Sequence, residues 1–198
     1  MTPPRSYDMT ARARAVERTR ERILAAAREA FFSTPFDDVT VAGVAAAAGT
    51  SHQTLLNHFG SKEGLFASLV EQVGREIEQN RGPERPHDAR SAVRVLVRQY
   101  EASGDVNARL AAVEDRIPAV AEALEIGRRS HQEWLARSFA DHLPASRPQH
   151  RRTLAALHAA TDVYTWKLLR RDLGLSRAET TAVMERLVHG LLTTSEEA

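Results

Sequence analysis

The sequence predicts an all-α protein of about nine helices. Alanine is abundant, apolar residues recur mostly at helical spacings, and glycine and proline gather at short intervals between the periodic segments. Hydrophobic residues make up 42% of the 198 residues, which is enough for a core of ordinary size. The length allows one large domain or two small ones.

The first helix is expected at residues 14–33, after a mobile, charged stretch at residues 1–13. It should end before Pro35, because proline disfavours helix for the residue that precedes it. Two short helices then follow within residues 40–66, and another helix is expected from 61 to 80. A polar stretch rich in glycine and proline at residues 81–88 is typical of a loop.

The remainder of the chain also has helical periodicity. Helices are expected at residues 89–102, 106–116, 118–142 and 149–172, with a first break at Ser103-Gly104-Asp105. The last helix should begin after Ser176, since Ser176 and Glu179 have the spacing of a capping box.

Residues 40–66 have the helix-turn-helix pattern, whose second helix can lie in a DNA major groove. Apolar residues of the first short helix share one face, and Thr40 precedes them as a cap. Gly49 follows, where a left-handed residue ends a helix, and Ser51 can cap the second helix. The second helix leaves polar side chains outside its apolar face: His52, Gln53, Asn57 and His58. An ordinary helical hairpin is the alternative interpretation.

The longer string A-x-x-A-G-x-S-x-x-T-L-x-x-H-F-x-S-K-E-x-L-F, from Ala45 to Phe66, resembles the DNA-binding domain of the TetR family of bacterial regulators. The resemblance covers residues 14–68. It implies phosphate contacts from Thr54, His58 and Lys62, with Thr40 and Ser51 as further DNA-binding residues. Leu56 stands where the family usually has a tyrosine that contacts phosphate. More of the specificity should therefore rest on His52, Gln53 and Asn57, since glutamine and asparagine can pair with adenine.

We expect residues 1–62 to form the DNA-binding domain with a basic N-terminal arm. Residues 1–28 hold seven arginines and three acidic residues, although the whole chain has a net charge of only +1. Such an arm suits the phosphate backbone, although a solvated tail would have the same composition.

Residues 63–198 are expected to form a helical domain for dimerisation and ligand sensing. The apolar stripes of the last two long helices predict the dimer interface: Leu154, Leu157, Thr161, Tyr164, Leu168, Met184, Leu187, Val188 and Leu191. Their alternative role is to fill the core of one monomer. Residues expected to line an apolar ligand pocket are Val73, Ile77, Val97, Tyr100, Leu110, Val113, His131, Trp134 and Phe139. Core packing is the alternative for these too.

The resemblance implies a homodimeric repressor that binds a palindromic operator in double-stranded DNA and is released by a small-molecule ligand. A DNA-binding regulator without such an effector is the second interpretation, and a helical enzyme is the third. No nucleotide-binding, hydrolase or zinc-protease motif supports an enzyme. The spacing of His158 and Asp162 fits a metal pair, an intrahelical hydrogen bond or a dimer-interface contact. We expect neither a metal nor a cofactor.

The absence of cysteine excludes disulfides and thiolate metal sites. The charged N-terminus does not resemble a secretory signal, and no stretch approaches 18 uninterrupted apolar residues. We therefore expect a cytoplasmic protein without a membrane partner.

Overall fold

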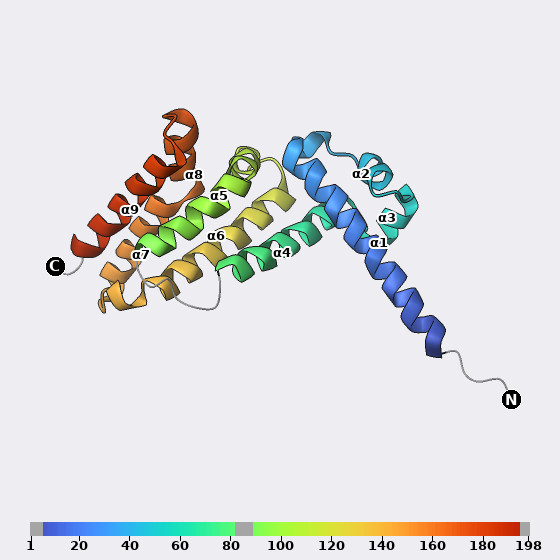
Figure 1. Ribbon diagram of the computed structural model, residues 1–198, viewed down its shortest axis with the longest axis horizontal. Helices are drawn as coiled ribbons and strands as arrows, with labels where there is room; N and C mark the ends of the chain where they lie inside the picture. Colours follow the sequence, from blue (N-terminus) through green and yellow to red (C-terminus); the bar gives the residue numbers. More distant parts are fainter. Residues whose placement is uncertain (1–5, 82–88, 195–198) are drawn as a thin grey trace. The chain divides into compact units, whose positions relative to one another are not determined.

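The described part of the chain contains nine α-helices and no strand, which confirms the predicted all-α class. The computed structural model describes residues 6–81 and 89–194. The helices, shown in Figure 1, are α1 (Ser6–Ser33), α2 (Val41–Ala47), α3 (His52–Phe59), α4 (Lys62–Arg81), α5 (Ala89–Ala111), α6 (Pro118–Ser138), α7 (Arg147–Thr161), α8 (Val163–Lys167) and α9 (Arg177–Thr194). Short 3-10 turns lie at η1 (Phe36–Asp38) and η2 (Ala140–His142), and a π-helical turn lies at η3 (Leu168–Asp172).

Two compact units divide the chain between Val73 and Gly74. This division lies within α4, later than the boundary we predicted after residue 62. The first turns of α4 belong to the N-terminal unit because their apolar side chains, among them Phe66, are buried. The Phe66 ring lies 5.0 Å from that of Phe31 and 5.1 Å from that of Phe36, and these three rings form the centre of the unit.

Helix α1 begins at Ser6, so the predicted start of the first helix at residue 14 is wrong. The side chains of residues 11–18 are all exposed. Their helix is supported by alanine, arginine and glutamate, which have high helix propensity, and not by a buried stripe. The most N-terminal residues, 1–5, and most of the predicted loop, 82–88, lie outside the described residues.

The C-terminal unit is built from α5 to α9 and the last turns of α4. Its core contains aromatic residues from three helices, Tyr100, Trp134 and Trp166, together with apolar residues of α7 and α9 such as Leu157 and Met184. Ser176 begins α9 as predicted: its N–H donates to Glu179 Oε2 at 2.8 Å, and its hydroxyl accepts from the Glu179 N–H at 3.2 Å.

Helix α5 continues through Ser103-Gly104-Asp105, so the predicted break there is wrong. Gly104 is buried because the indole of Trp166 packs directly onto it, and a Cβ at this position would collide with that ring. Ion pairs anchor both sides of this contact: Arg170 Nε lies 2.7 Å from Glu101 Oε1, and Arg171 Nε lies 2.9 Å from Asp105 Oδ1. Tertiary packing therefore replaces the local preference for a turn.

Three other predicted helices end earlier or are interrupted. The helix expected at 106–116 is the end of α5 and stops at Ala111, and the one expected at 118–142 stops at Ser138. The helix expected at 149–172 is divided, because Asp162 is extended and caps α8 by accepting from the Tyr164 N–H at 2.8 Å.

Candidate functional site

Local hydrogen bonds define the helix-turn-helix, α2 and α3. Thr40 Oγ1 accepts from the Gly43 N–H at 3.1 Å, and Ser51 Oγ accepts from the Thr54 N–H at 3.1 Å, so both predicted caps are present. Gly49 has a φ of 62°, the left-handed conformation that glycine adopts without strain. A Cβ at Gly64 would collide with the carbonyl oxygen of Phe59, so α4 can begin close to α3 only because this residue is glycine.

The exposed face of α3 carries the three side chains predicted to read bases. His52, Gln53 and Asn57 are exposed, whereas Leu55 and Phe59 of the same helix are buried. Gln53 Nε2 donates to Asn57 Oδ1 at 2.9 Å, so the two amides are held together one turn apart. The remaining Asn57 amide donor and Gln53 carbonyl are available for hydrogen bonds with base edges.

The predicted phosphate contacts differ in how they are held. The Thr54 hydroxyl lies 2.8 Å from Ser51 Oγ. Lys62 Nζ donates to the Asp37 carbonyl at 3.1 Å and lies 4.6 Å from the centre of the Phe36 ring. This lysine is thus positioned by two contacts to η1, and the ammonium group has hydrogens left for an anion. The third predicted phosphate contact, His58, is half-buried, as is Leu56.

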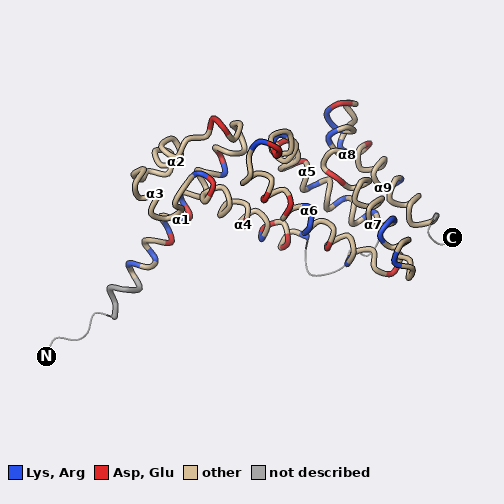
Figure 2. Tube along the Cα trace, turned by 180° about the vertical axis from the view of Figure 1, so that it is seen from behind, with Lys and Arg blue, Asp and Glu red and all other residues tan. Residues whose placement is uncertain are grey.

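Arginines of α1 add positive charge to the N-terminal unit, and Figure 2 shows them in blue along the helix. Arg12, Arg14 and Arg18 are exposed. Arg20 instead packs its guanidinium 5.2 Å from the ring centre of Phe59 at the end of α3. The exposed arginines have the chemistry for phosphate contacts.

The residues expected to line a ligand pocket divide into two groups. Five of them are buried in the C-terminal unit: Val97, Tyr100, His131, Trp134 and Phe139. The other four are half-buried: Val73, Ile77, Leu110 and Val113. Two of the five buried residues make polar contacts with Thr161. Tyr100 Oη donates to the Thr161 carbonyl at 2.9 Å, and His131 Nε2 lies 3.0 Å from Thr161 Oγ1.

Burial strongly perturbs the ionisable groups of this cluster. Burial, with the positive charge of Arg81 nearby, lowers the pKa of His131 to about 3, so the imidazole is neutral at pH 7. His158 Nε2 lies 3.3 Å from Asp162 Oδ2. Burial opposes the charge of Asp162, but hydrogen bonds from His158 and the Tyr164 N–H lower its pKa overall. The His158–Asp162 spacing thus corresponds to a side-chain contact, and no cluster of potential metal ligands occurs among the described residues.

Arg81 belongs to the same cluster but could not be identified from the sequence. It is the last residue of α4, whereas the sequence predicts it as the first residue of the polar loop at 81–88, so that prediction is wrong for Arg81. Its guanidinium is buried against Trp134, 4.9 Å from the ring centre, and Nε donates to Gln99 Oε1 at 3.2 Å. An arginine at a helix end normally indicates solvent exposure, so periodicity contains no signal for this contact.

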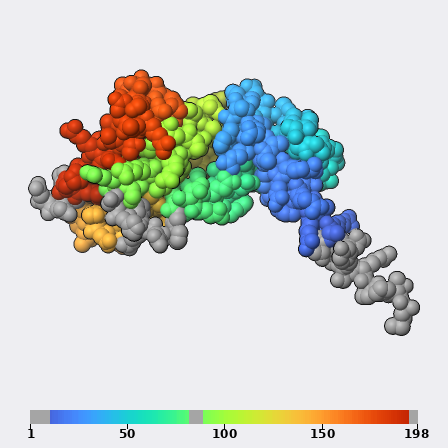
Figure 3. Space-filling view, viewed as in Figure 1, coloured from blue at the N-terminus to red at the C-terminus, as the bar shows by residue number. Residues whose placement is uncertain are grey.

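The residues predicted to form the dimer interface do not share one surface. Leu157, Thr161, Met184 and Val188 are buried within the core of their own unit, and Leu154 and Leu191 pack partly against it. Three others are exposed: Tyr164, Leu168 and Leu187. The predicted seam is broken because α7 ends at Thr161. Figure 3 shows the surface of α8, η3 and α9 in red beside α5 in green.

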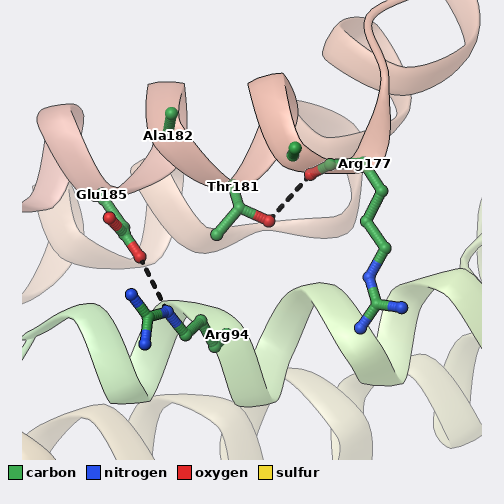
Figure 4. A pocket seen from close by; sticks show the side chains of 6 residues that line it. Arg94, Arg177, Thr181, Ala182 and Glu185 are labelled. Carbon is green, nitrogen blue, oxygen red and sulfur yellow. Dashed lines mark hydrogen bonds and ion pairs between the residues drawn. The ribbon is translucent and has the colours of Figure 1, made fainter.

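A shallow open hollow of about 530 Å³ lies between α5 and α9 (Figure 4). Arg94 and Glu185 form an ion pair across it at 3.3 Å, and Arg177 and Thr181 extend it along α9. None of the residues predicted to line a ligand pocket contributes to this hollow. In the part of the chain that the structure describes, no helix has the length and apolar character to cross a membrane.

Comparisons with known proteins agree with this geometry. Residues 23–69 match the family model of the bacterial regulatory proteins, tetR family. The fold resembles a TetR-family transcriptional regulator from Mesorhizobium loti MAFF303099 (TM-score 0.65, 21% identity, 90% of this chain and 97% of that one). It also resembles NalD, the secondary repressor of the MexAB-OprM multidrug efflux pump in Pseudomonas aeruginosa, with a TM-score of 0.60 and 20% identity over 88% of this chain and 96% of that one. A third similar structure is the SmeT–triclosan complex, with a TM-score of 0.61 and 18% identity over 89% of this chain and 90% of that one.

No curated protein matches the chain in sequence. The family match nevertheless covers the whole helix-turn-helix, including both capped helices and the exposed face of α3. The solved structures extend the likeness in fold to most of the chain. Residues 23–69 are therefore similar to the DNA-binding domain of the tetR family of bacterial regulatory proteins, and the rest of the chain shares the fold of such regulators.

Proposed function

We propose that this regulator is a homodimeric repressor that binds an inverted-repeat operator and releases it when a small molecule binds the C-terminal unit. The observation that carries the proposal is the exposed face of α3, where Gln53 and Asn57 are held together at 2.9 Å beside His52. One such helix reads only a few base pairs, so a specific operator requires two copies.

Exposed apolar residues support the dimer. Tyr164, Leu168, Leu173 and Leu187 of α8, η3, the following turn and α9 are between 44% and 62% exposed. Large apolar side chains that remain exposed are typical of a surface that a partner covers when they lie close together. A stable dimer of this kind buries on the order of 2,000 Å² or more.

Two relatives support repression and its control by a ligand. NalD is a repressor, and SmeT was solved in complex with triclosan. In this chain, the C-terminal unit contains a buried polar cluster around Tyr100, His131 and Trp134 that a simple apolar core would not require. Enzymatic activity is set aside, since regulators of this family act by binding DNA.

The operator is tested with the full chain and a library of random DNA duplexes. We expect selected duplexes to contain two inverted half-sites, placed so that two α3 helices about 34–36 Å apart, or somewhat more, reach the same face. Selection of single asymmetric sites that bind one copy would contradict the proposal. A gel shift with a chemical library then identifies compounds that release the operator. A regulator without an effector would bind the operator unchanged with every compound.

The dimer is tested by replacing one exposed leucine. Leu187→Asp should give a folded monomer with greatly weakened operator binding, measured by sedimentation and by gel shift. Ile126→Asp on α6 is the matched control, because Ile126 is similarly exposed but lies outside the stretch from α8 to α9. An intact dimer of the Leu187→Asp variant would refute the proposed interface.

A further inference from the structure

A buried guanidinium in the C-terminal unit forms no ion pair with the described residues, although the charge of Glu78 acts on it electrostatically. Arg81 is only 8% exposed, yet no carboxylate among the described residues forms an ion pair with it. Its Nε donates to the neutral amide of Gln99, its guanidinium carbon lies over the Trp134 ring, and Nη1 has no hydrogen-bond partner. Buried charges in proteins are normally paired, because removing a charge from water is costly. The position therefore calls for an anion.

The second unpartnered atom in the cluster is a hydrogen-bond acceptor. The hydroxyl hydrogen of Thr161 is used by a backbone carbonyl, since Oγ1 donates to Leu157 O at 2.7 Å. Thr161 Oγ1 must then accept from His131 Nε2 at 3.0 Å, which places the imidazole hydrogen on Nε2. The neutral ring thus presents a bare lone pair at Nδ1. This atom is buried and has no partner, in a residue that is 7% exposed.

The two unsatisfied groups lie against one side chain. The Arg81 guanidinium lies 4.9 Å from the ring centre of Trp134, and the His131 ring is stacked on the same residue at 6.2 Å with an angle of 18° between planes. The neighbouring Tyr100 hydroxyl donates to the Thr161 carbonyl and so has no hydrogen for His131 Nδ1, and its oxygen makes no hydrogen bond with Arg81 Nη1. The cluster therefore combines an unpaired cation, a free acceptor and an indole.

We propose that Arg81 and His131 bind a small organic anion that also carries a hydroxyl or N–H group, such as a hydroxylated aromatic acid. The acid group accepts from Arg81 Nη1, and the hydroxyl or N–H donates to His131 Nδ1. The ligand role of this site rests on the proposed control by a small molecule and adds its chemical class.

Simpler ligands would satisfy at most one of the two groups, the Arg81 guanidinium or His131 Nδ1. A water molecule supplies both an acceptor and a donor, but it leaves the guanidinium charge unneutralised. A chloride ion neutralises Arg81 but has no hydrogen for His131 Nδ1. A purely apolar compound satisfies neither atom. An acid with a hydroxyl group satisfies both, and the charge-assisted contact to arginine is the stronger of the two.

Calorimetry on the full chain without DNA tests the proposal, with benzoate, phenol and the three isomers of hydroxybenzoate as probes. The isomers differ only in the distance between the acid group and the hydroxyl group. We expect at least one isomer to bind at least tenfold more tightly than both benzoate and phenol. If no isomer exceeds both simpler probes, the proposed pair of contacts is wrong.

Two variants separate the contacts. Arg81→Met should weaken benzoate and the best hydroxybenzoate alike, by tenfold or more. His131→Phe should retain benzoate binding but remove the advantage of the hydroxyl group. Arg94→Met, an exposed arginine of α5, is the matched control and should bind as the parent does. Thermal unfolding of each variant checks folding, and Arg81→Lys replaces Arg81→Met if the latter unfolds. Equal losses for both probes in His131→Phe would overturn the role of Nδ1.

Failure of this site is distinguishable from failure of the proposed function. Probe binding that depends on Arg81 but leaves operator affinity unchanged would support the site and refute ligand release by it. Release of the operator by other compounds, with no binding of any acid probe, would support ligand control and refute the site.

Discussion

Acidification should destabilise the protein through His131, and the size of the effect follows from its burial. The pKa of His131 is lowered to about 3 in the folded chain, whereas an unfolded histidine has a pKa of about 6.5. Between these two values the unfolded chain binds a proton that the folded chain does not. The stability that the neutral His131 contributes is therefore fully present above pH 6.5 and is lost as the pH falls toward 3. From pH 7 to pH 5, this single group should cost about 2 kcal/mol.

The window from pH 7 to pH 5 isolates this histidine from the carboxylates. Asp162 and Glu101 also have lowered pKa values, but these groups contribute at more acidic pH. We propose His131→Gln as the test variant, because a glutamine amide can still donate to Thr161 Oγ1 and has no pKa in this range. His142→Gln on η2 is the control, since His142 is exposed.

Unfolding in urea at pH 7 and pH 5 measures the difference. Between pH 7 and pH 5, the free energy of unfolding of the parent and of the His142→Gln control should each fall by about 2 kcal/mol more than that of His131→Gln. For a chain of this size, this difference corresponds to roughly 4–8 °C in Tm. If His131→Gln loses as much stability as the parent, the imidazole is not buried in its neutral form. The assigned tautomer, and with it the free acceptor at Nδ1, would then be wrong.

Three further predictions concern packing and DNA contact. Gly104→Ala should be about 1–3 kcal/mol less stable than Gly127→Ala, because only Gly104 lies against Trp166 while both gain helix propensity; equal unfolding midpoints would contradict this. Gln53→Ala should change the ranking of operator variants by about 1–3 kcal/mol per affected position in binding titrations, and uniform weakening would exclude base reading. Lys62→Gln should weaken all sequences alike and lower the salt slope by about one, and a sequence-dependent loss would exclude a phosphate contact.

The helix-turn-helix could be predicted closely because its signals are local. Thr40 and Ser51 cap helices by accepting from N–H groups three residues later, and Gly49 has the positive φ that its position after α2 requires. The alternation of buried Leu55 with exposed Gln53 also follows from helix geometry alone. Such features depend on neighbours within four residues, and a sequence displays them directly.

The C-terminal unit was predicted less well because long-range contacts decide its details. Gly104 resembled a helix breaker, but Trp166, far along the chain, packs onto it and keeps α5 continuous. The seam that begins at Leu154 had regular spacing, but Asp162 caps a new helix within it. The partners of Arg81 and His131 likewise come from other helices, so periodicity predicted buried positions without their unsatisfied atoms.

Helix α4 connects the two proposed activities through one continuous element. It has 20 residues, or about 30 Å. Lys62 at its start donates to the Asp37 carbonyl in the DNA-binding unit, and Arg81 at its end lies in the buried cluster of the C-terminal unit. In the proposed mechanism, an anion that pairs with Arg81 acts on the last turn of the helix whose first residue, Lys62, is predicted to contact phosphate. To release the operator, the anion must prefer the non-binding conformation. A hundredfold preference corresponds to about 2.7 kcal/mol and, by linkage, requires operator DNA to weaken anion binding by the same factor. Equal anion affinities with and without operator DNA would refute release of the operator through this site.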